Sequence, residues 1–221
     1  MLPLTVWWWL GHLAMTTATT RSPWDQEYVR RSDTYVFGTA PSLLALELAP
    51  SIPPGGRVLD LGCGEGRDSV FFASRGFEVT GVDPSAAGLR KAQRLAEERG
   101  VEVTWVEATP PDLSVSGRFD LVYSCGAIHY VPRRDRRRLF RALRFLTAVG
   151  GREAHIVFTD RWIYRERGEL IDYFAPGELA SAFAPGEILR REERMISCAQ
   201  DGRPHLHSVE LLVAAPLDVR L

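Results

Sequence analysis

The chain has 221 residues, of which 45% are hydrophobic and 25% are charged, and these proportions are typical of a folded globular protein. Its 27 basic and 28 acidic side chains give a net charge of −1, which argues against a general affinity for nucleic acids or anionic membranes. The three cysteines cannot all pair within one chain, and their spacing matches no zinc motif. We therefore expect reduced thiols and a cytoplasmic protein.

Residues 1–22 begin with an apolar run, Leu2–Ala14, followed by a polar stretch. The run is shorter than the about 18–20 apolar residues that span a bilayer, and no basic residue precedes it as in a signal peptide. We expect residues 1–22 to be a disordered or over-extended leader. Residues 23–221 are then expected to form a single domain.

Short apolar segments alternate with helical segments along the rest of the chain. The expected strands cover residues 57–62, 77–83, 101–108, 118–126, 153–160, 187–197 and 205–215. The expected helices cover residues 66–76, 86–99, 137–148 and 176–185. This alternation predicts an α/β fold with a doubly wound, mostly parallel seven-stranded sheet. The last two strands, joined by the turn-like sequence DGRP, predict an antiparallel C-terminal hairpin at one edge.

The loop after the first expected strand has the composition of a cofactor-binding loop. It reads DLGCGEGRD and contains one acidic residue, Asp60, and three glycines, Gly62, Gly64 and Gly66. Glycines accept positive φ and let backbone N–H groups approach a ligand, while the next helix directs its N-terminus at negative charge. Asp83 ends the next expected strand, where sheets of this kind bind ribose hydroxyls. A dinucleotide fingerprint would require a third glycine at the position of Arg67.

Residues 58–85, VLDLGCGEGRDSVFFASRGFEVTGVDPS, resemble the first two motifs of the class I S-adenosylmethionine-dependent methyltransferases. YVFGTAPS (35–42), FDLVYSCGAIHYVP (119–132) and the C-terminal hairpin resemble the small bacterial tellurite and thiopurine methyltransferase-like group. The resemblance implies a Rossmann-like methyltransferase fold and S-adenosylmethionine as the cofactor. It also implies methyl transfer to a small-molecule acceptor, which could be a thiol, a chalcogen oxyanion, or an oxygen or nitrogen nucleophile of a metabolite.

The same resemblance implies roles for individual residues. Asp60 and the three glycines would surround the methionine part of the cofactor, and Asp83 would accept hydrogen bonds from the ribose. Ser124 and Cys125 would lie against the sulfonium. The segment that closes over the cofactor would include Tyr35, Gly38 and Pro41. Many relatives place an aspartate after the third strand for the adenine amine, but this chain has Thr109, so Ala108, Thr109 or Asp112 could make that contact.

Three histidines are the candidate catalytic residues. His129 follows the fourth expected strand and could orient a substrate or accept a proton, or it could pack and hydrogen-bond to the backbone. His205 and His207 share one face of the last strand, and no Cys, Asp or Glu of matching spacing accompanies them, so we expect a substrate role without a metal. Arg161 and Trp162 follow the fifth strand and would line a substrate mouth, although Arg161 could instead form a surface ion pair.

The arginine-rich stretch RRDRRRLFRALR is interpreted as a helix that covers the sheet. Its apolar residues would form one face and its arginines a solvated one, so RNA binding is not expected. The expected partner is a small-molecule acceptor, without nucleic acid or membrane, and the expected assembly is a monomer or homodimer. Two other classes stay open. One is a non-catalytic S-adenosylmethionine-binding regulatory protein, and the other is a nicotinamide-dependent oxidoreductase, which the missing third glycine disfavours.

Overall fold

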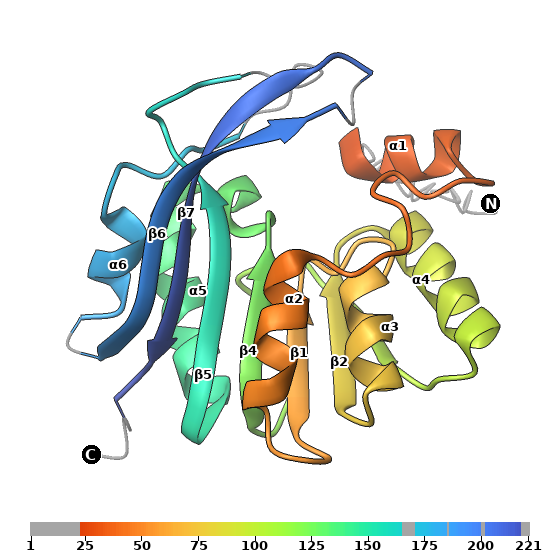
Figure 1. Cartoon of the computed structure of the whole chain (residues 1–221), viewed down its shortest axis with the longest axis horizontal. Helices are drawn as coiled ribbons and strands as arrows, with labels where there is room; N and C mark the ends of the chain where they lie inside the picture. The colour runs from red at the N-terminus through yellow and green to blue at the C-terminus, as the bar shows by residue number, and fades with distance from the viewer. Residues whose placement is uncertain (1–22, 165–170, 185, 200–201, 218–221) are drawn as a thin grey trace, which may run out of the picture.

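The structure is a computed structural model that describes residues 23–164, 171–184, 186–199 and 202–217, so the leader expected over residues 1–22 lies outside it. Seven strands form one sheet with the order β3-β2-β1-β4-β5-β7-β6 (Figure 1). The strands are β1 (Arg57–Leu61), β2 (Glu78–Asp83), β3 (Thr104–Glu107), β4 (Phe119–Cys125), β5 (Thr147–Phe158), β6 (Glu187–Cys198) and β7 (His205–Ala215). The helices are α1 (Pro23–Arg30), α2 (Leu43–Leu48), α3 (Arg67–Ser74), α4 (Ala86–Arg99), α5 (Arg133–Leu146) and α6 (Glu178–Ala182).

The sheet confirms the predicted fold class. β1 pairs in parallel with β2 and β4, β2 with β3, and β4 with β5, whereas β7 is antiparallel to both β5 and β6. The third strand is shorter than expected because it is an edge strand that pairs only with residues 80–83 of β2. The fifth strand starts earlier than expected, because Thr147 leaves α5 in an extended conformation and pairs with Phe119.

Helices cover both faces of the sheet. α2 and α3 pack on one face, where Leu44 and Phe72 are buried, and α5 and α6 pack on the other. The apolar face expected on α5 is confirmed, since Leu139 and Leu143 are fully buried. The solvated face expected for its arginines is wrong at Arg136, which is buried and donates to the Val131 carbonyl and to the carboxylate of Glu178, 2.9 Å away.

The N-terminal part of the described chain crosses the carboxyl end of the parallel strands. Figure 1 shows α1 and the far end of the β6–β7 hairpin at that end of the sheet. The Asp25 carboxylate accepts hydrogen bonds from the Ser85 hydroxyl (2.6 Å) and the Ala87 N–H (3.1 Å), so α1 supplies a side-chain cap for the N-terminus of α4.

A buried ion pair attaches this crossing segment to the glycine loop. Lys91 of α4 is the only lysine of the chain, and its ammonium donates to Glu65 and to the carbonyls of Arg31 (2.7 Å) and Thr34 (2.6 Å). The second Glu65 oxygen accepts from the Val36 N–H at 2.7 Å. Both ionic side chains are nearly inaccessible to solvent, so the pair depends on this complete set of hydrogen bonds.

We predict that Lys91→Met lowers the free energy of unfolding by about 3–5 kcal/mol, because it leaves the Glu65 carboxylate buried without its cation. Urea denaturation measures the loss. Arg94→Met is the matched control, since Arg94 also lies on α4 and donates to a carbonyl of the same crossing segment, that of Ser32, but is exposed. Adding Glu65→Gln to the first variant should restore part of the stability. Equal losses in Lys91→Met and Arg94→Met would contradict the role given to burial.

Candidate cofactor and acceptor site

Two adjoining cavities lie at the carboxyl ends of the parallel strands. The larger has a volume of about 580 Å³, and its lining includes Trp24, Leu61, Asp83, Thr109, Ile128 and Tyr130. The smaller has a volume of about 260 Å³, and its lining includes Phe37, Gly38, Asp60, Cys125, Ile196 and Cys198. Gly62 and Gly126 line both cavities, so the two spaces meet beside the glycine loop.

Asp83 presents a fixed carboxylate to the larger cavity. Its two oxygens accept hydrogen bonds from the N–H groups of Gly64 (2.9 Å) and Ser85 (2.8 Å). Burial raises the pKa of Asp83 to about 6, against the opposing effect of these two hydrogen bonds. Each oxygen keeps further lone-pair capacity, so the carboxylate can accept hydrogen bonds from a diol in the cavity.

Asp60 is a second buried carboxyl, located at the smaller cavity. It accepts a 2.6 Å hydrogen bond from the Ser69 hydroxyl. Burial, together with the charge of the nearby Asp68, raises its pKa to about 7. The two acids therefore differ in their surroundings, because Asp83 is stabilised by two backbone N–H groups and Asp60 by one hydroxyl.

The glycines of the loop are needed chiefly for close packing within the protein. Gly62 has φ +73°, and a Cβ there would lie 2.1 Å from the Cβ of Ala127. Its N–H donates to the Val82 carbonyl at 2.7 Å, and the N–H of Gly64 donates to Asp83. The N–H groups of Gly62 and Gly64 thus have partners within the protein, while both glycines line the smaller cavity, and their cofactor role stays a prediction. They hold the loop against the end of β2 and so position the Asp83 carboxylate.

The other expected cofactor residues divide between cavity walls and supporting structure. Gly38, Thr109 and Cys125 line a cavity, as expected of residues that contact a ligand. Five others line neither of the two cavities: Tyr35, Pro41, Gly66, Ala108 and Ser124. Their cofactor role stays a prediction.

Three cavity residues, Trp24, Ile128 and Tyr130, were not expected from the sequence. Trp24 and Tyr130 meet edge to face, with ring centroids 6.1 Å apart. Ile128 and Tyr130 follow the end of β4, whereas Trp24 lies on α1, about a hundred residues earlier in the chain. Only the alternation of apolar and aromatic residues after β4 could have indicated Ile128 and Tyr130.

His129 is enclosed within the protein and lines neither of the two cavities. Its Nδ1 accepts a hydrogen bond from the Phe158 N–H at 3.2 Å, and its ring stacks on the Phe158 ring at 4.0 Å. Burial lowers the pKa of His129 to about 3, so the imidazole is neutral at physiological pH. These contacts match the packing alternative given above, and the catalytic role stays a prediction.

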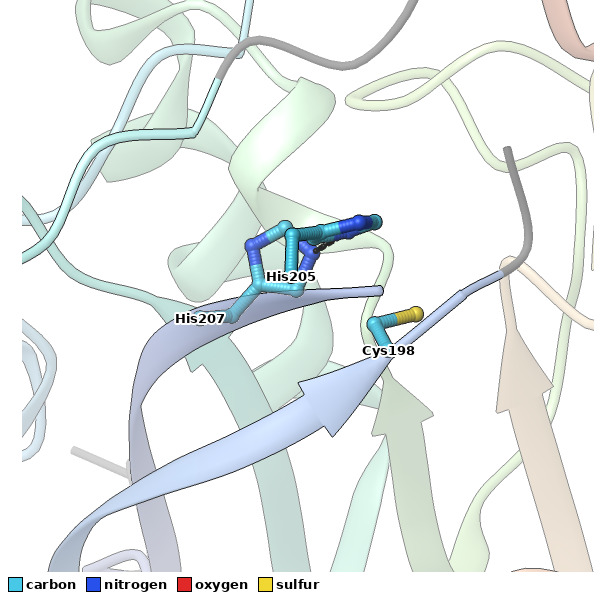
Figure 2. Close-up of side chains that lie close together, drawn as sticks. All are labelled: Cys198, His205 and His207. Carbon is cyan, nitrogen blue, oxygen red and sulfur yellow. Dashed lines mark hydrogen bonds between the residues drawn. The ribbon is translucent and has the colours of Figure 1, made fainter. Parts of the chain in front are cut away.

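His205 and His207 lie together with a third side chain that the sequence analysis missed. Their Nε2 atoms are 2.9 Å apart, and Figure 2 shows Cys198 of the neighbouring strand beside them. The candidate ligand atoms of the three residues lie within 4.8 Å of one another. The argument that no third ligand accompanies the histidines is therefore wrong, because hairpin pairing places Cys198 opposite His205.

Arg161 and Trp162 line neither of the two cavities. Arg161 forms an ion pair of 2.8 Å with Glu193 of β6, and the arginine side chain is 58% exposed. This is the surface ion pair given as its alternative role. Trp162 is 53% exposed, so the substrate role of both residues stays a prediction.

A doubly wound sheet with a buried acid at the end of its second strand, facing a cavity, defines an α/β protein that binds a nucleoside-containing ligand. Residues 58–151 match the family model described as a methyltransferase domain. Over this segment, which includes the glycine loop and Asp83, the chain is similar to methyltransferases.

Individual proteins and solved structures are similar to parts or to most of this chain. The ubiquinone biosynthesis O-methyltransferase of Alkalilimnicola ehrlichii is 38% identical over 107 residues, which are 48% of this chain and 41% of that protein. TehB from Haemophilus influenzae has a similar fold, with a TM-score of 0.72 and 20% identity over 87% of this chain and 67% of that one. The N-methyltransferase NodS from Bradyrhizobium japonicum, in complex with S-adenosyl-L-homocysteine, has a TM-score of 0.68 and 16% identity over 89% of this chain and 100% of that one. The chain thus spans less than half the length of the ubiquinone methyltransferase.

The cavities fit S-adenosylmethionine. The larger has apolar and aromatic walls suited to adenine, and the Asp83 carboxylate suits the two ribose hydroxyls. The smaller cavity is joined to it at Gly62 and Gly126. No helix among the described residues is long and apolar enough to cross a membrane.

We predict that Asp83→Ala weakens S-adenosylmethionine binding by about 2–3 kcal/mol, the scale of two charge-assisted hydrogen bonds lost together. Isothermal titration calorimetry measures the change, and circular dichroism checks that the fold is retained. Unchanged affinity would remove Asp83 from the binding site.

We also predict a pH-dependent difference in stability between the wild type and Asp60→Asn. Because the folded protein raises the pKa of Asp60 to about 7, its contribution to stability is complete at about pH 4 and is lost as pH rises through 7. Asparagine does not titrate. From pH 4 to pH 8 the variant should therefore gain up to about 4 kcal/mol relative to the wild type in urea denaturation. Parallel stability curves would show that folding does not raise the pKa of Asp60.

Proposed function

We propose that this protein transfers a methyl group from S-adenosylmethionine to a small-molecule acceptor. The observation that carries the proposal is the pair of cavities joined at Gly62 and Gly126, one beside the Asp83 carboxylate and the other beside Asp60 and Cys125. The family match over residues 58–151 supports it. The acceptor would be a thiol, a chalcogen oxyanion, or an oxygen or nitrogen nucleophile of a metabolite.

The residues of the chain would act mainly by binding and orientation. S-adenosylmethionine supplies an electrophilic methyl group on a sulfonium that carries its own leaving group. Asp83 would accept the ribose hydroxyls, and Trp24, Ile128 and Tyr130 would pack against the adenine. The crossing segment held by Lys91 would keep water out of the smaller cavity. The acceptor gains the methyl group and S-adenosylhomocysteine leaves. A protonated acceptor also releases a proton.

The surroundings favour an acceptor that needs little help from a base. The neutral, enclosed His129 has a pKa of about 3, which is poorly matched to proton abstraction near neutral pH. A soft thiolate or chalcogen nucleophile attacks a sulfonium methyl group without such a base. This favours the tellurite and thiopurine methyltransferase-like group that the sequence resembles over oxygen acceptors.

The remaining expectations are part of the same proposal. We propose one catalytic domain over residues 23–221 that acts in the cytoplasm as a monomer or homodimer, without a nucleic-acid or membrane partner. The net charge of −1 and the single continuous sheet support it.

The test is formation of S-adenosylhomocysteine from S-adenosylmethionine with a panel of thiols, selenite, tellurite and small phenols. We expect turnover with at least one thiol or chalcogen acceptor and its loss in Asp83→Ala at cofactor concentrations that saturate the wild type. Mass spectrometry of the ligand bound to the purified protein separates the alternatives. Bound S-adenosylmethionine without turnover on any acceptor would indicate a regulatory binding protein, and a bound nicotinamide nucleotide would indicate an oxidoreductase.

A further inference from the structure

The β6–β7 hairpin brings one thiol and two imidazoles to the same place. Cys198, the last residue of β6, pairs with His205, the first residue of β7, and Ile196 pairs with His207. Residues that pair across strands share a face of the sheet, and so do residues two apart on one strand. All three candidate donor atoms therefore lie on one face, within 4.8 Å of one another (Figure 2).

The hydrogen bonds of His205 leave its Nε2 ready to bind a cation. Its Nδ1 lies 2.7 Å from the Arg203 carbonyl oxygen, which can only accept, so Nδ1 carries the proton and Nε2 has the lone pair. That Nε2 accepts from Nε2 of His207, 2.9 Å away. Metal-binding histidines commonly donate their other ring N–H to a carbonyl in this way. The proton between the two rings lies where a shared cation would bind.

Both imidazole rings are held in place by aromatic neighbours. The His207 ring stacks on Phe158 with centroids 4.0 Å apart and an interplanar angle of 15°. The His205 ring stacks on Tyr164 at 3.8 Å and 3°. His207 is fully buried and His205 is 8% exposed. Folding has therefore already restricted the ring orientations, which reduces the entropy lost when both bind one ion.

We propose that Cys198, His205 and His207 bind a divalent ion of the zinc class through one thiolate sulfur and two Nε2 atoms. One cysteine and two histidines are a donor set that zinc binds, and three protein ligands leave one position of a tetrahedral ion for an exchangeable ligand. Binding releases the thiol proton of Cys198, and the His207 proton moves from Nε2 to Nδ1. The expectation of no metal is replaced by this proposal.

The site would adjoin the acceptor side of the cavities. Cys198 lines the smaller cavity together with Asp60 and Cys125. The exchangeable position would be open to a soft donor atom that enters this cavity. We identify this donor atom with the sulfur of a thiol-class methyl acceptor, and that identification rests on the proposed function. The ion site itself does not rest on it.

The experiment is titration of the chelator-treated full chain with Co²⁺, without S-adenosylmethionine. We expect one equivalent to bind with the visible bands of tetrahedral cobalt and a thiolate-to-cobalt charge-transfer band. Cys198→Ser should lose the charge-transfer band. His205→Gln should weaken binding by at least about 100-fold, because even changes behind a ligand cost 10–100-fold. Ser197→Ala, next to Cys198 but on the other face of β6, is the control and should bind like the wild type.

A wild-type protein that binds no stoichiometric cobalt, or binds it without the thiolate band, would overturn the site, and so would a Cys198→Ser variant with an unchanged spectrum. Addition of 2-mercaptoethanol to the cobalt form tests the exchangeable position. A changed charge-transfer band supports it, and an unchanged spectrum overturns it. Because this titration involves no methyl transfer, its failure is distinct from failure of the proposed function.

Discussion

The ion pair between Lys91 and Glu65 is the interaction on which the arrangement of the site depends. It joins the glycine loop, α4 and the chain that crosses over them, through four hydrogen bonds that leave neither charge unmatched. A charge buried without its partner costs several kcal/mol. The burial of Lys91 and Glu65 therefore requires that both charges and their hydrogen bonds form together. The segment that the ion pair holds follows directly on α1, which carries Trp24 at the larger cavity.

Asp60 and Asp83 show how two neighbouring strands produce two different carboxyl environments. Asp83 is the last residue of β2, where the N–H groups of Gly64 and Ser85 donate to it and partly offset the cost of its burial. Asp60 lies within β1, where strand pairing already uses the backbone groups, and a hydroxyl is its remaining donor. The acid at the strand end is therefore the better acceptor for a ligand, and the acid inside the strand is the better support for the loop.

Features governed by local pattern could be predicted from the sequence. The strand alternation, the Ser85 cap and the Gly100 end of α4, and the acid at the end of β2 all follow from residues close together along the chain. Features that depend on distant contacts could not. The burial of Arg136 requires Glu178, and the cavity wall at Trp24 requires the packing of α1 across the sheet end. The partner of Arg161 is likewise distant, since Glu193 lies on β6, so the choice between its two stated roles could not be made from the local sequence.

The cluster of Cys198, His205 and His207 in the hairpin depends both on local sequence and on distant contacts. Only a short turn separates Cys198 from His205. Whether their side chains lie on the same face, however, depends on the register of β6 against β7, which the turn residues alone do not specify. A shift of one residue would turn Cys198 to the opposite face from His205 and His207. The long pairing of the two strands, which extends back to Glu187 and Ala215 in the packed sheet, holds that register. The grouping of Cys198 with the two histidines beside the smaller cavity is thus a consequence of strand pairing that extends far from that cavity.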